Sequence, residues 1–93
     1  MTNIINKAEK IADILKNFSN KDKLIILCYL GNNEKNVSEI LNCCNISQSQ
    51  VSQFLNKMKL EGILSSTKNW KEVYYKISDT KTLEIIEKLK QIF

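Results

Sequence analysis

The spacing of apolar residues changes at Gly62, and this change limits the folds that the chain can adopt. Before Gly62, apolar residues recur every three or four positions, which is the spacing of amphipathic helices. After Gly62, segments 63–67 and 73–77 are rich in β-branched and aromatic residues, with the polar stretch 68–72 between them. This second pattern predicts a β-hairpin. We therefore expect a mainly α-helical chain with one small β-hairpin.

Two helices are predicted in the first third of the chain. The first is expected at residues 2–17, and the second at residues 20–30, where Gly31 ends it. Ser19 is expected to cap the second helix through its side-chain hydroxyl. The stretch 31–33 then forms a turn.

Two further helices joined by a tight turn are predicted before Gly62. Apolar residues in segment 37–41 mark the shorter one, and Ser47 begins the longer one with a capping box that pairs it with Gln50. The apolar side of the longer helix is expected to be Val51, Phe54, Leu55, Met58 and Leu60. Its other side carries amides and hydroxyls with almost no charge, which is unusual for a helix face that only contacts solvent. With a last helix after the hairpin, the predicted order of elements is ααααββα.

Composition favours one folded domain, residues 1–93, without catalytic activity. No linker-like or low-complexity tract occurs, and no apolar run is long enough for a membrane span or a signal peptide. We therefore expect a cytoplasmic protein. The chain has no histidine, which removes the commonest general base and the commonest zinc ligand. An enzyme is not expected.

The basic excess narrows the range of partners. The formal net charge is +4, and all 14 basic residues are lysine. Such a charge suits a nucleic-acid backbone or an anionic membrane surface, and composition alone does not choose between them. The order of elements favours DNA, because two short helices followed by a hairpin are the plan of a winged helix-turn-helix. One helix of this plan enters the major groove, and the hairpin reaches the neighbouring backbone or minor groove.

Four motifs resemble successive parts of the ArsR/SmtB family. They are VSEIL at 37–41, ISQSQVSQFL at 46–55, KLEGIL at 59–64 and VYYKI at 73–77. The resemblance covers nearly the whole chain, and its most specific part is the Ser-Gln-Ser-x-Val-Ser-Gln core. It implies a homodimeric repressor that releases operator DNA when a metal, a metalloid or an oxidant alters the dimer. One departure is Phe54, where the family usually carries histidine.

The resemblance also implies which side chains contact DNA. It places Gln48, Ser49, Ser52 and Gln53 at base edges or adjacent phosphates, and Gln50, Asn56 and Lys57 at the periphery. In the hairpin, Lys68 and Lys71 are expected at phosphates, although a charged hairpin tip also serves solubility. Amide side chains match the N6 and N7 atoms of adenine, and the chain has no arginine for guanine. We therefore expect an AT-rich operator with an inverted repeat.

The first and last helices are expected to form a homodimer. The last helix is predicted to start from Ser78 or Asp79 as its cap. Its wide apolar face consists of Leu83, Ile85, Ile86, Leu89, Ile92 and Phe93. These two helices carry more apolar surface than a chain of this size readily hides, and the resemblance implies that they pair between subunits. The alternative is that both helices close the core of a monomer.

Metal sensing is not expected, and thiol sensing stays open. Segment 37–41 lacks the paired cysteines of the family's arsenic site, and the last helix offers Asp79, Glu84 and Glu87 but no histidine for zinc. No metal or other cofactor is therefore expected. Candidates for thiol sensing are Cys28, Cys43 and Cys44. The position of Cys28 resembles that of the second-helix cysteine in sulfide- and oxidant-responsive members, but the last helix lacks their second cysteine.

Two other functions fit the same sequence. One is a ligand-independent regulator, such as a phage or plasmid protein that responds only to its own concentration. The other is a winged-helix module that binds protein, because fold does not fix function. The salt dependence of DNA affinity distinguishes a DNA-binding regulator from a protein-binding module. Phosphate contacts make the DNA affinity of a regulator fall with salt, whereas a protein-binding module would show no DNA binding to weaken.

Overall fold

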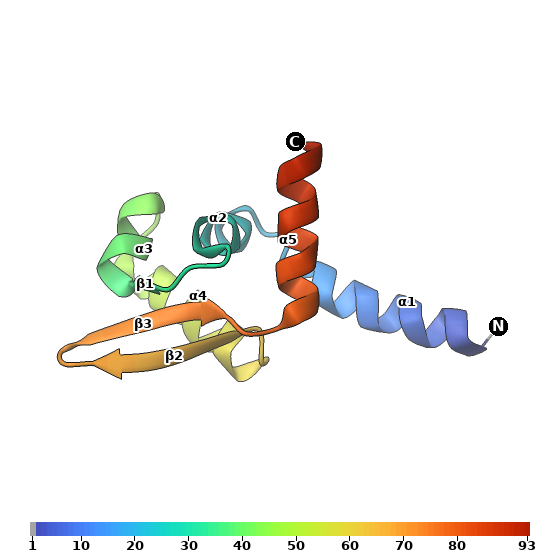
Figure 1. The fold of residues 1–93 in the computed structure, drawn as a ribbon, viewed down its shortest axis with the longest axis horizontal. Coiled ribbons are helices and arrows are strands. Elements are labelled where there is room, and N and C mark those ends of the chain that lie inside the picture. Colours follow the sequence, from blue (N-terminus) through green and yellow to red (C-terminus); the bar gives the residue numbers. More distant parts are fainter. Residues whose placement is uncertain (1) are drawn as a thin grey trace.

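The computed structural model describes residues 2–93 and contains five helices and one three-stranded sheet over those residues (Figure 1). The elements are α1 (Thr2–Leu15), α2 (Lys21–Leu30), β1 (Lys35–Asn36), α3 (Val37–Cys43), α4 (Gln48–Leu60), β2 (Leu64–Asn69), β3 (Glu72–Ile77) and α5 (Thr80–Ile92). The predicted order of helices and hairpin strands is confirmed. The structure adds one short strand, β1, between α2 and α3.

The sheet joins the hairpin to the start of the helix-turn-helix. Its strand order is β1-β3-β2, and both pairings are antiparallel. Strand β1 was not predicted, because its two residues become a strand only by pairing with β3, where Lys35 lies opposite Tyr75. In the hairpin, Asn69 pairs with Glu72, so the turn contains only two residues. The predicted five-residue connection, 68–72, was therefore too long.

The helix starts confirm two of the predicted caps and correct one. Ser47 caps α4 in the predicted capping box, and Asp79, not Ser78, caps α5 by accepting from the backbone N–H of Thr82. The cap of α2 is Asn20, whose Oδ1 accepts from two backbone N–H groups. Ser19 was the wrong prediction, because its hydroxyl donates to the carbonyl of Lys16 at 2.9 Å.

One hydrophobic core lies between the helix-turn-helix, the sheet and α5. Its buried members are Ile26, Leu27, Leu30, Ile40, Val51, Leu55, Met58, Ile63, Leu64, Tyr75, Ile77 and Ile86. The core therefore fixes α4 against α2, α3 and β2, as the predicted apolar side of α4 requires. The prediction was wrong for Leu60, which is 89% exposed at the end of α4.

Helix α1 projects from the rest of the molecule, opposite the end reached by the hairpin (Figure 1). Every side chain from Asn3 to Asp13 is exposed, and burial begins only in the last turn, near Ile14 and Asn17. The molecule is accordingly elongated, with extents of 50 × 27 × 22 Å. The apolar side chains of α1 before its last turn are therefore left exposed by the rest of the described chain.

Candidate nucleic-acid interface

The structure brings the predicted DNA contacts to the molecular surface on two neighbouring elements. All nine are exposed, and they are Gln48, Ser49, Gln50, Ser52, Gln53, Asn56 and Lys57 on α4 together with Lys68 and Lys71 on the hairpin. Residues three, four and seven apart share a helix face. Ser49, Ser52, Gln53 and Asn56 therefore form a central row of hydroxyls and amides along the exposed side of α4.

The start of α4 is held by reciprocal hydrogen bonds. The Ser47 Oγ accepts from the backbone N–H of Gln50 at 3.2 Å, and the Gln50 Oε1 accepts from the backbone N–H of Ser47 at 3.2 Å. Such a box satisfies two backbone donors that the first turn leaves open. Because this box engages its carbonyl oxygen, Gln50 has only its amide NH₂ left for an outside partner.

The buried side of α4 fixes which side chains face outward. Val51 and Met58 are 0% exposed, and Leu55 is 1% exposed. Closely packed side chains of this kind resist rotation of the helix, since any turn about its axis would open a cavity. The exposed row of amides and hydroxyls is thus presented by a rigid element, which is what contact with base edges requires.

The structure contains a buried lysine beside α4 that sequence analysis did not predict. Lys23, on α2, is only 7% exposed, and its Nζ lies 5.6 Å from the ring centroid of Phe54. Burial lowers the pKa of Lys23, and the nearby charge of Lys57 lowers it further. The family-atypical Phe54 therefore receives a cation on its ring face. The only signal in the sequence was the position of Lys23, three residues before the buried Ile26 and four before the buried Leu27 of α2.

The hairpin, hereafter the wing, consists of β2, β3 and their turn, and it leads directly from the end of α4. The backbone N–H of Ile63 donates to the Met58 carbonyl at 2.9 Å, and Gly62 adopts a positive φ of 79° that reverses the chain. Lys68 and Lys71 are exposed near the tip. The structure thus places two lysines near the free end of the wing, whose base follows the end of α4.

An acidic residue of the wing is already engaged. Glu72 Oε2 accepts from the Tyr74 hydroxyl at 2.9 Å and from Asn36 Nδ2 at 3.3 Å. The hydrogen bond to Glu72 raises the pKa of Tyr74, as does the negative charge of that carboxylate. These two donors direct the carboxylate toward the protein's own groups, at the side of the wing where β1 pairs with β3.

Two further exposed residues of α4 were missed as candidates. Lys59 borders the polar row, and Leu60 lies seven residues after Gln53, two helical turns further along the same face. Lys59 could have been found from the helical spacing, because it lies seven residues after Ser52. Leu60 could not, because its apolar side chain was assigned to the core.

The three thiols do not form one site. Within residues 2–93, no three potential metal ligands gather closely enough to hold an ion. Cys43 Sγ and Cys44 Sγ lie 3.7 Å apart, and the Cys43 thiol donates to the Ile40 carbonyl. Burial and the neighbouring Cys43 raise the pKa of the Cys44 thiol to about 12.

Cys28 instead lines an apolar hollow of about 650 Å³ between α1, α2 and α5. Thiol sensing stays a prediction.

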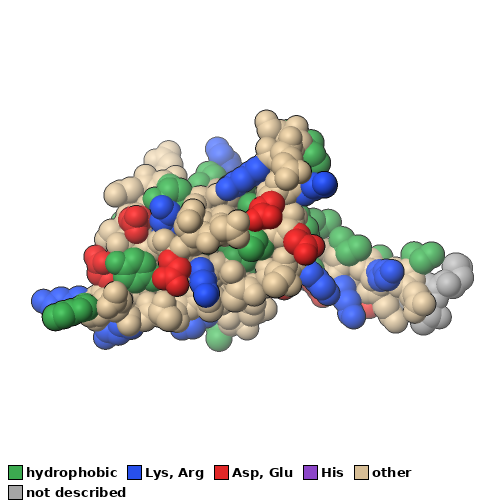
Figure 2. Space-filling view, in the orientation of Figure 1, with side chains coloured by type: hydrophobic (Ala, Val, Ile, Leu, Met, Phe, Trp, Pro, Cys, Tyr) green, Lys and Arg blue, Asp and Glu red, His purple; other side chains and the backbone are tan. Residues whose placement is uncertain are grey.

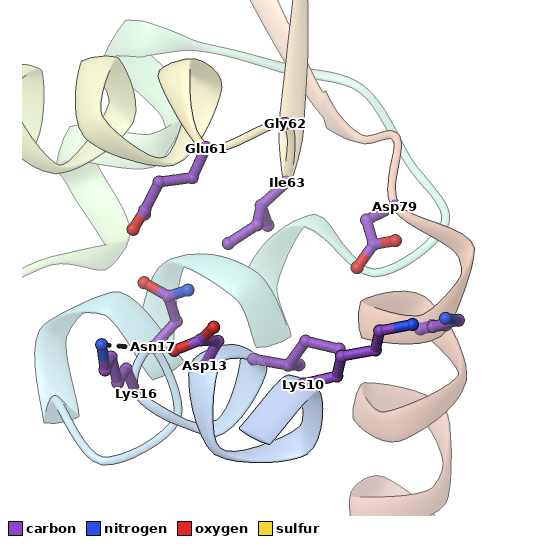
Figure 3. Close-up of a pocket in the computed structure, with 10 residues that line it drawn as sticks. Lys10, Asp13, Lys16, Asn17, Glu61, Gly62, Ile63 and Asp79 are labelled. Carbon is purple, nitrogen blue, oxygen red and sulfur yellow. Dashed lines mark ion pairs between the residues drawn. The ribbon is translucent and has the colours of Figure 1, made fainter. Parts of the chain in front are cut away.

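A second hollow, of about 500 Å³, lies between α1, the end of α4 and the start of α5 (Figure 3). Lysines and carboxylates line it together. Asp13 Oδ1 pairs with Lys16 Nζ at 3.4 Å, and the carboxylate of Asp79 caps α5. Because charges of both signs line this hollow and two of its carboxylates are engaged, it offers no surface of one sign.

A helix-turn-helix that exposes amides and hydroxyls, followed by a wing with lysines, defines the winged-helix class of DNA-binding proteins. The family model of bacterial regulatory proteins of the arsR family matches residues 20–66. The chain belongs to the ArsR family, and it is a transcriptional regulator rather than an enzyme. Within residues 2–93, no helix is both long and apolar enough to cross a membrane.

Relatives from several bacteria match most of the chain. The transcriptional activator HlyU of Vibrio cholerae is 33% identical over 88 residues, which cover 95% of this chain and 81% of HlyU. The biofilm growth-associated repressor of Xylella fastidiosa is 29% identical over 87 residues, 94% of this chain and 76% of that protein. The solved structure of reduced HlyU from Vibrio cholerae superimposes with a TM-score of 0.93 at 30% identity, covering 100% of this chain and 98% of that one.

Proposed function

We propose that the chain is a homodimeric repressor that places α4 in the major groove of operator DNA and the wing against the adjacent backbone or minor groove. The observation that carries this proposal is the central row Ser49, Ser52, Gln53 and Asn56, exposed on a helix whose opposite side is locked into the core. A helix fits the major groove, where each base pair presents a distinct set of donors and acceptors.

The chemistry of the row supports adenine-containing sites. A glutamine or asparagine amide offers a donor and an acceptor together, which match N6 and N7 of adenine. Gln53 and Asn56 are the amides of the row, and Gln48 lies at its start. The chain has no arginine for the bidentate contact to guanine. An AT-rich operator follows, and the two-fold symmetry of a dimer implies an inverted repeat.

Lysines supply the contacts that do not depend on sequence. The candidates are Lys57 on α4 and Lys68 and Lys71 on the wing, and all three are exposed. A lysine is a compact point charge that suits a phosphate, and each neutralised phosphate adds about 0.9 to the salt slope of DNA binding. The affinity for operator DNA is therefore expected to fall linearly with the logarithm of the salt concentration.

Exposed apolar side chains on α1 and α5 support a dimer formed through these helices. Six of the eight large hydrophobic residues exposed in the structure lie there or at the C-terminal residue, namely Ile4, Ile5, Ile11, Leu15, Ile92 and Phe93. The apolar hollow between α1, α2 and α5 is continuous with them through Leu15 and Phe93. Covering this surface with a second subunit would stabilise the assembly, since contiguous exposed apolar area marks interaction sites.

Repression is the simplest consequence of this geometry. A winged helix that occupies a promoter can block it without contacting polymerase, and one relative is named a repressor. Another relative is named an activator, so the direction of regulation needs its own assay. In a reporter strain with the upstream promoter, we expect the wild-type chain to lower transcription; raised transcription would overturn repression but not DNA binding.

The test of DNA binding is a mobility shift with the DNA upstream of the protein's own gene, repeated over a range of salt concentrations. Gln53→Ala is expected to abolish specific binding while circular dichroism shows an intact fold. The matched control is Asn33→Ala, which removes an exposed amide in the turn after α2, outside α4 and the wing. Equal loss in both variants, or full retention in both, would contradict the assignment of α4. Absence of DNA binding by the wild type at any salt concentration would favour a protein-binding module.

A further inference from the structure

The wing ends in a tryptophan whose side chain is almost fully exposed among the residues that the structure describes. Trp70 is 89% exposed and stands in the two-residue turn between Asn69 and Glu72. Lys68 and Lys71 lie close to it in the sequence, and both are exposed. Figure 2 shows apolar and basic side chains side by side at the tip of the hairpin, at the left of the view. The tip therefore combines a large flat apolar group with positive charge.

The backbone of Trp70 is also strained. Its φ is 63°, and it is the one residue other than glycine with a positive φ in the part of the chain that the structure describes. A positive φ at the first position of a two-residue hairpin turn normally belongs to glycine, because a Cβ is crowded there. A bulky residue in that conformation is an outlier that destabilises the free protein.

Packing within the chain does not compensate for this strain. The indole is almost fully exposed to water, so it gains neither burial nor, in the structure, a hydrogen bond. A glycine would relieve the strain, and a polar residue would remove the exposed apolar surface. Strain and exposure of one side chain at one position indicate a role outside the folded monomer, since backbone strain concentrates at functional sites.

We propose that Trp70 is a wedge that enters the minor groove of operator DNA, with Lys68 and Lys71 on the flanking phosphates. This inference rests on the proposed function, because it needs α4 in the neighbouring major groove. The wing follows α4 directly and is fixed to α3 through the hydrogen bond between Asn36 and Glu72. Apolar side chains that enter the minor groove partly unstack base steps, and AT-rich steps such as TA are the easiest to open.

DNA is favoured over other occupants by the surroundings of the indole. Lys68 and Lys71 flank the indole in the sequence, and the wing is joined to α4 by a short connection at Gly62. Trp70 would then contribute to specificity through the deformability of the DNA and not through base hydrogen bonds. A role in contacting a protein partner would leave DNA affinity independent of the indole.

The experiment uses the full chain and a duplex selected from random sequence with the wild-type protein. Trp70 is the only tryptophan in the sequence, so its fluorescence reports on this position alone. On adding the duplex, we expect the emission maximum to shift to the blue and the intensity to fall. A minor-groove ligand added as competitor should reverse both changes.

Variants at the same position separate the indole from the charge. Trp70→Ala is expected to weaken DNA binding about tenfold, a loss typical of removing one stacked aromatic group. Trp70→Phe should retain most of the affinity. Trp70→Gly should bind as weakly as the alanine variant and yet have a higher midpoint of urea unfolding than the wild type, because glycine relieves the strain. Lys71→Ala should lower the salt slope by about 1, whereas Trp70→Ala should leave that slope unchanged.

The outcomes distinguish the two proposals. Three results together would overturn the wedge and leave the proposed function intact. Trp70→Ala would bind DNA with wild-type affinity, the fluorescence of the wild-type protein would not change on adding the duplex, and Gln53→Ala would lose binding. The same fluorescence change with DNA whose minor groove is blocked throughout would overturn the groove assignment. Failure of the wild-type chain to select any duplex would overturn the proposed function and the wedge together.

Discussion

Asn36 and Glu72 join the helix-turn-helix to the wing through one side-chain hydrogen bond, from Asn36 Nδ2 to Glu72 Oε2 at 3.3 Å. The other end of the same amide, Asn36 Oδ1, accepts from the backbone N–H of Glu39 at 2.8 Å and so caps α3. One amide therefore serves as the helix cap and as the link to the wing. This hydrogen bond adds to the backbone pairing of β1 with β3, which also holds the wing against the start of α3.

Replacing Asn36 should reveal both roles. Asn36→Ala is expected to lower the free energy of unfolding by about 1 kcal/mol, because the cap of α3 is lost. Glu72→Ala removes the link and the hydrogen bond from the Tyr74 hydroxyl but keeps the cap, and both lost bonds are exposed, so its loss should be smaller. Asn36→Asp keeps the cap and sets a carboxylate against Glu72, and an intermediate value is expected. Urea unfolding measures all three, and equal stability of Asn36→Ala and wild type would refute the capping role.

The same substitution at two leucines of α4 should have opposite outcomes. Leu55 is 1% exposed in the core, and Leu60 is 89% exposed. Leu55→Ala leaves a cavity and should cost roughly 2–5 kcal/mol of unfolding free energy. Leu60→Ala should stay within about 0.5 kcal/mol of the wild type. Thermal or urea unfolding decides the matter, and similar losses in both variants would mean that Leu60 is covered in solution.

A charge on α1 should disrupt the proposed dimer. Ile11 is 52% exposed on the apolar side of α1, and glutamate there would be buried without a partner in the assembly. Ile11→Glu is expected to shift sedimentation equilibrium toward monomer. Leu60→Glu serves as the control, since it adds the same charge at an exposed leucine of α4, outside the apolar surface of α1 and α5. If both variants sediment as the wild type does, α1 does not form the interface.

Cys44 should react slowly with alkylating reagents. Burial raises the pKa of its thiol to about 12, and the reactive form is the thiolate. At pH 8 we expect alkylation of Cys44 in the folded chain to be far slower than in the urea-unfolded chain, as followed by mass spectrometry of peptides. The raised pKa also implies that its contribution to stability is complete below pH 9 and is lost as the pH rises toward 12, because only the unfolded chain releases the proton there. Rapid alkylation of Cys44 in the folded chain would contradict the raised pKa of its thiol.

The cap of α4 could be predicted from sequence, and the cap of α2 could not. In α4, Ser47 and Gln50 have the spacing of a capping box, and Ile46, directly before Ser47, has no side-chain acceptor that could compete. Before α2, Ser19 and Asn20 are adjacent, and both residue types are good caps. The choice depends on the backbone after Phe18, where the Ser19 hydroxyl turns back to Lys16.

The missed features of the interface arise from tertiary structure. Strand β1 has only two residues, and its conformation comes from pairing with β3, which local sequence does not encode. The turn at Trp70 was predicted as part of a longer loop, because tryptophan is a poor residue for a positive φ. The exposed face of α4 was predictable, since helical spacing separates its amides from the apolar side.

Because α1 projects from the rest of the molecule, its helicity should depend on the protein concentration. An isolated helix of 14 residues is only marginally stable in water, and α1 receives few contacts from its own chain. Its turns should therefore fray on dilution and re-form by mass action as chains associate. The far-ultraviolet circular dichroism per residue is accordingly expected to weaken in dilute samples, so that cellular abundance would set the helicity of the N-terminal segment.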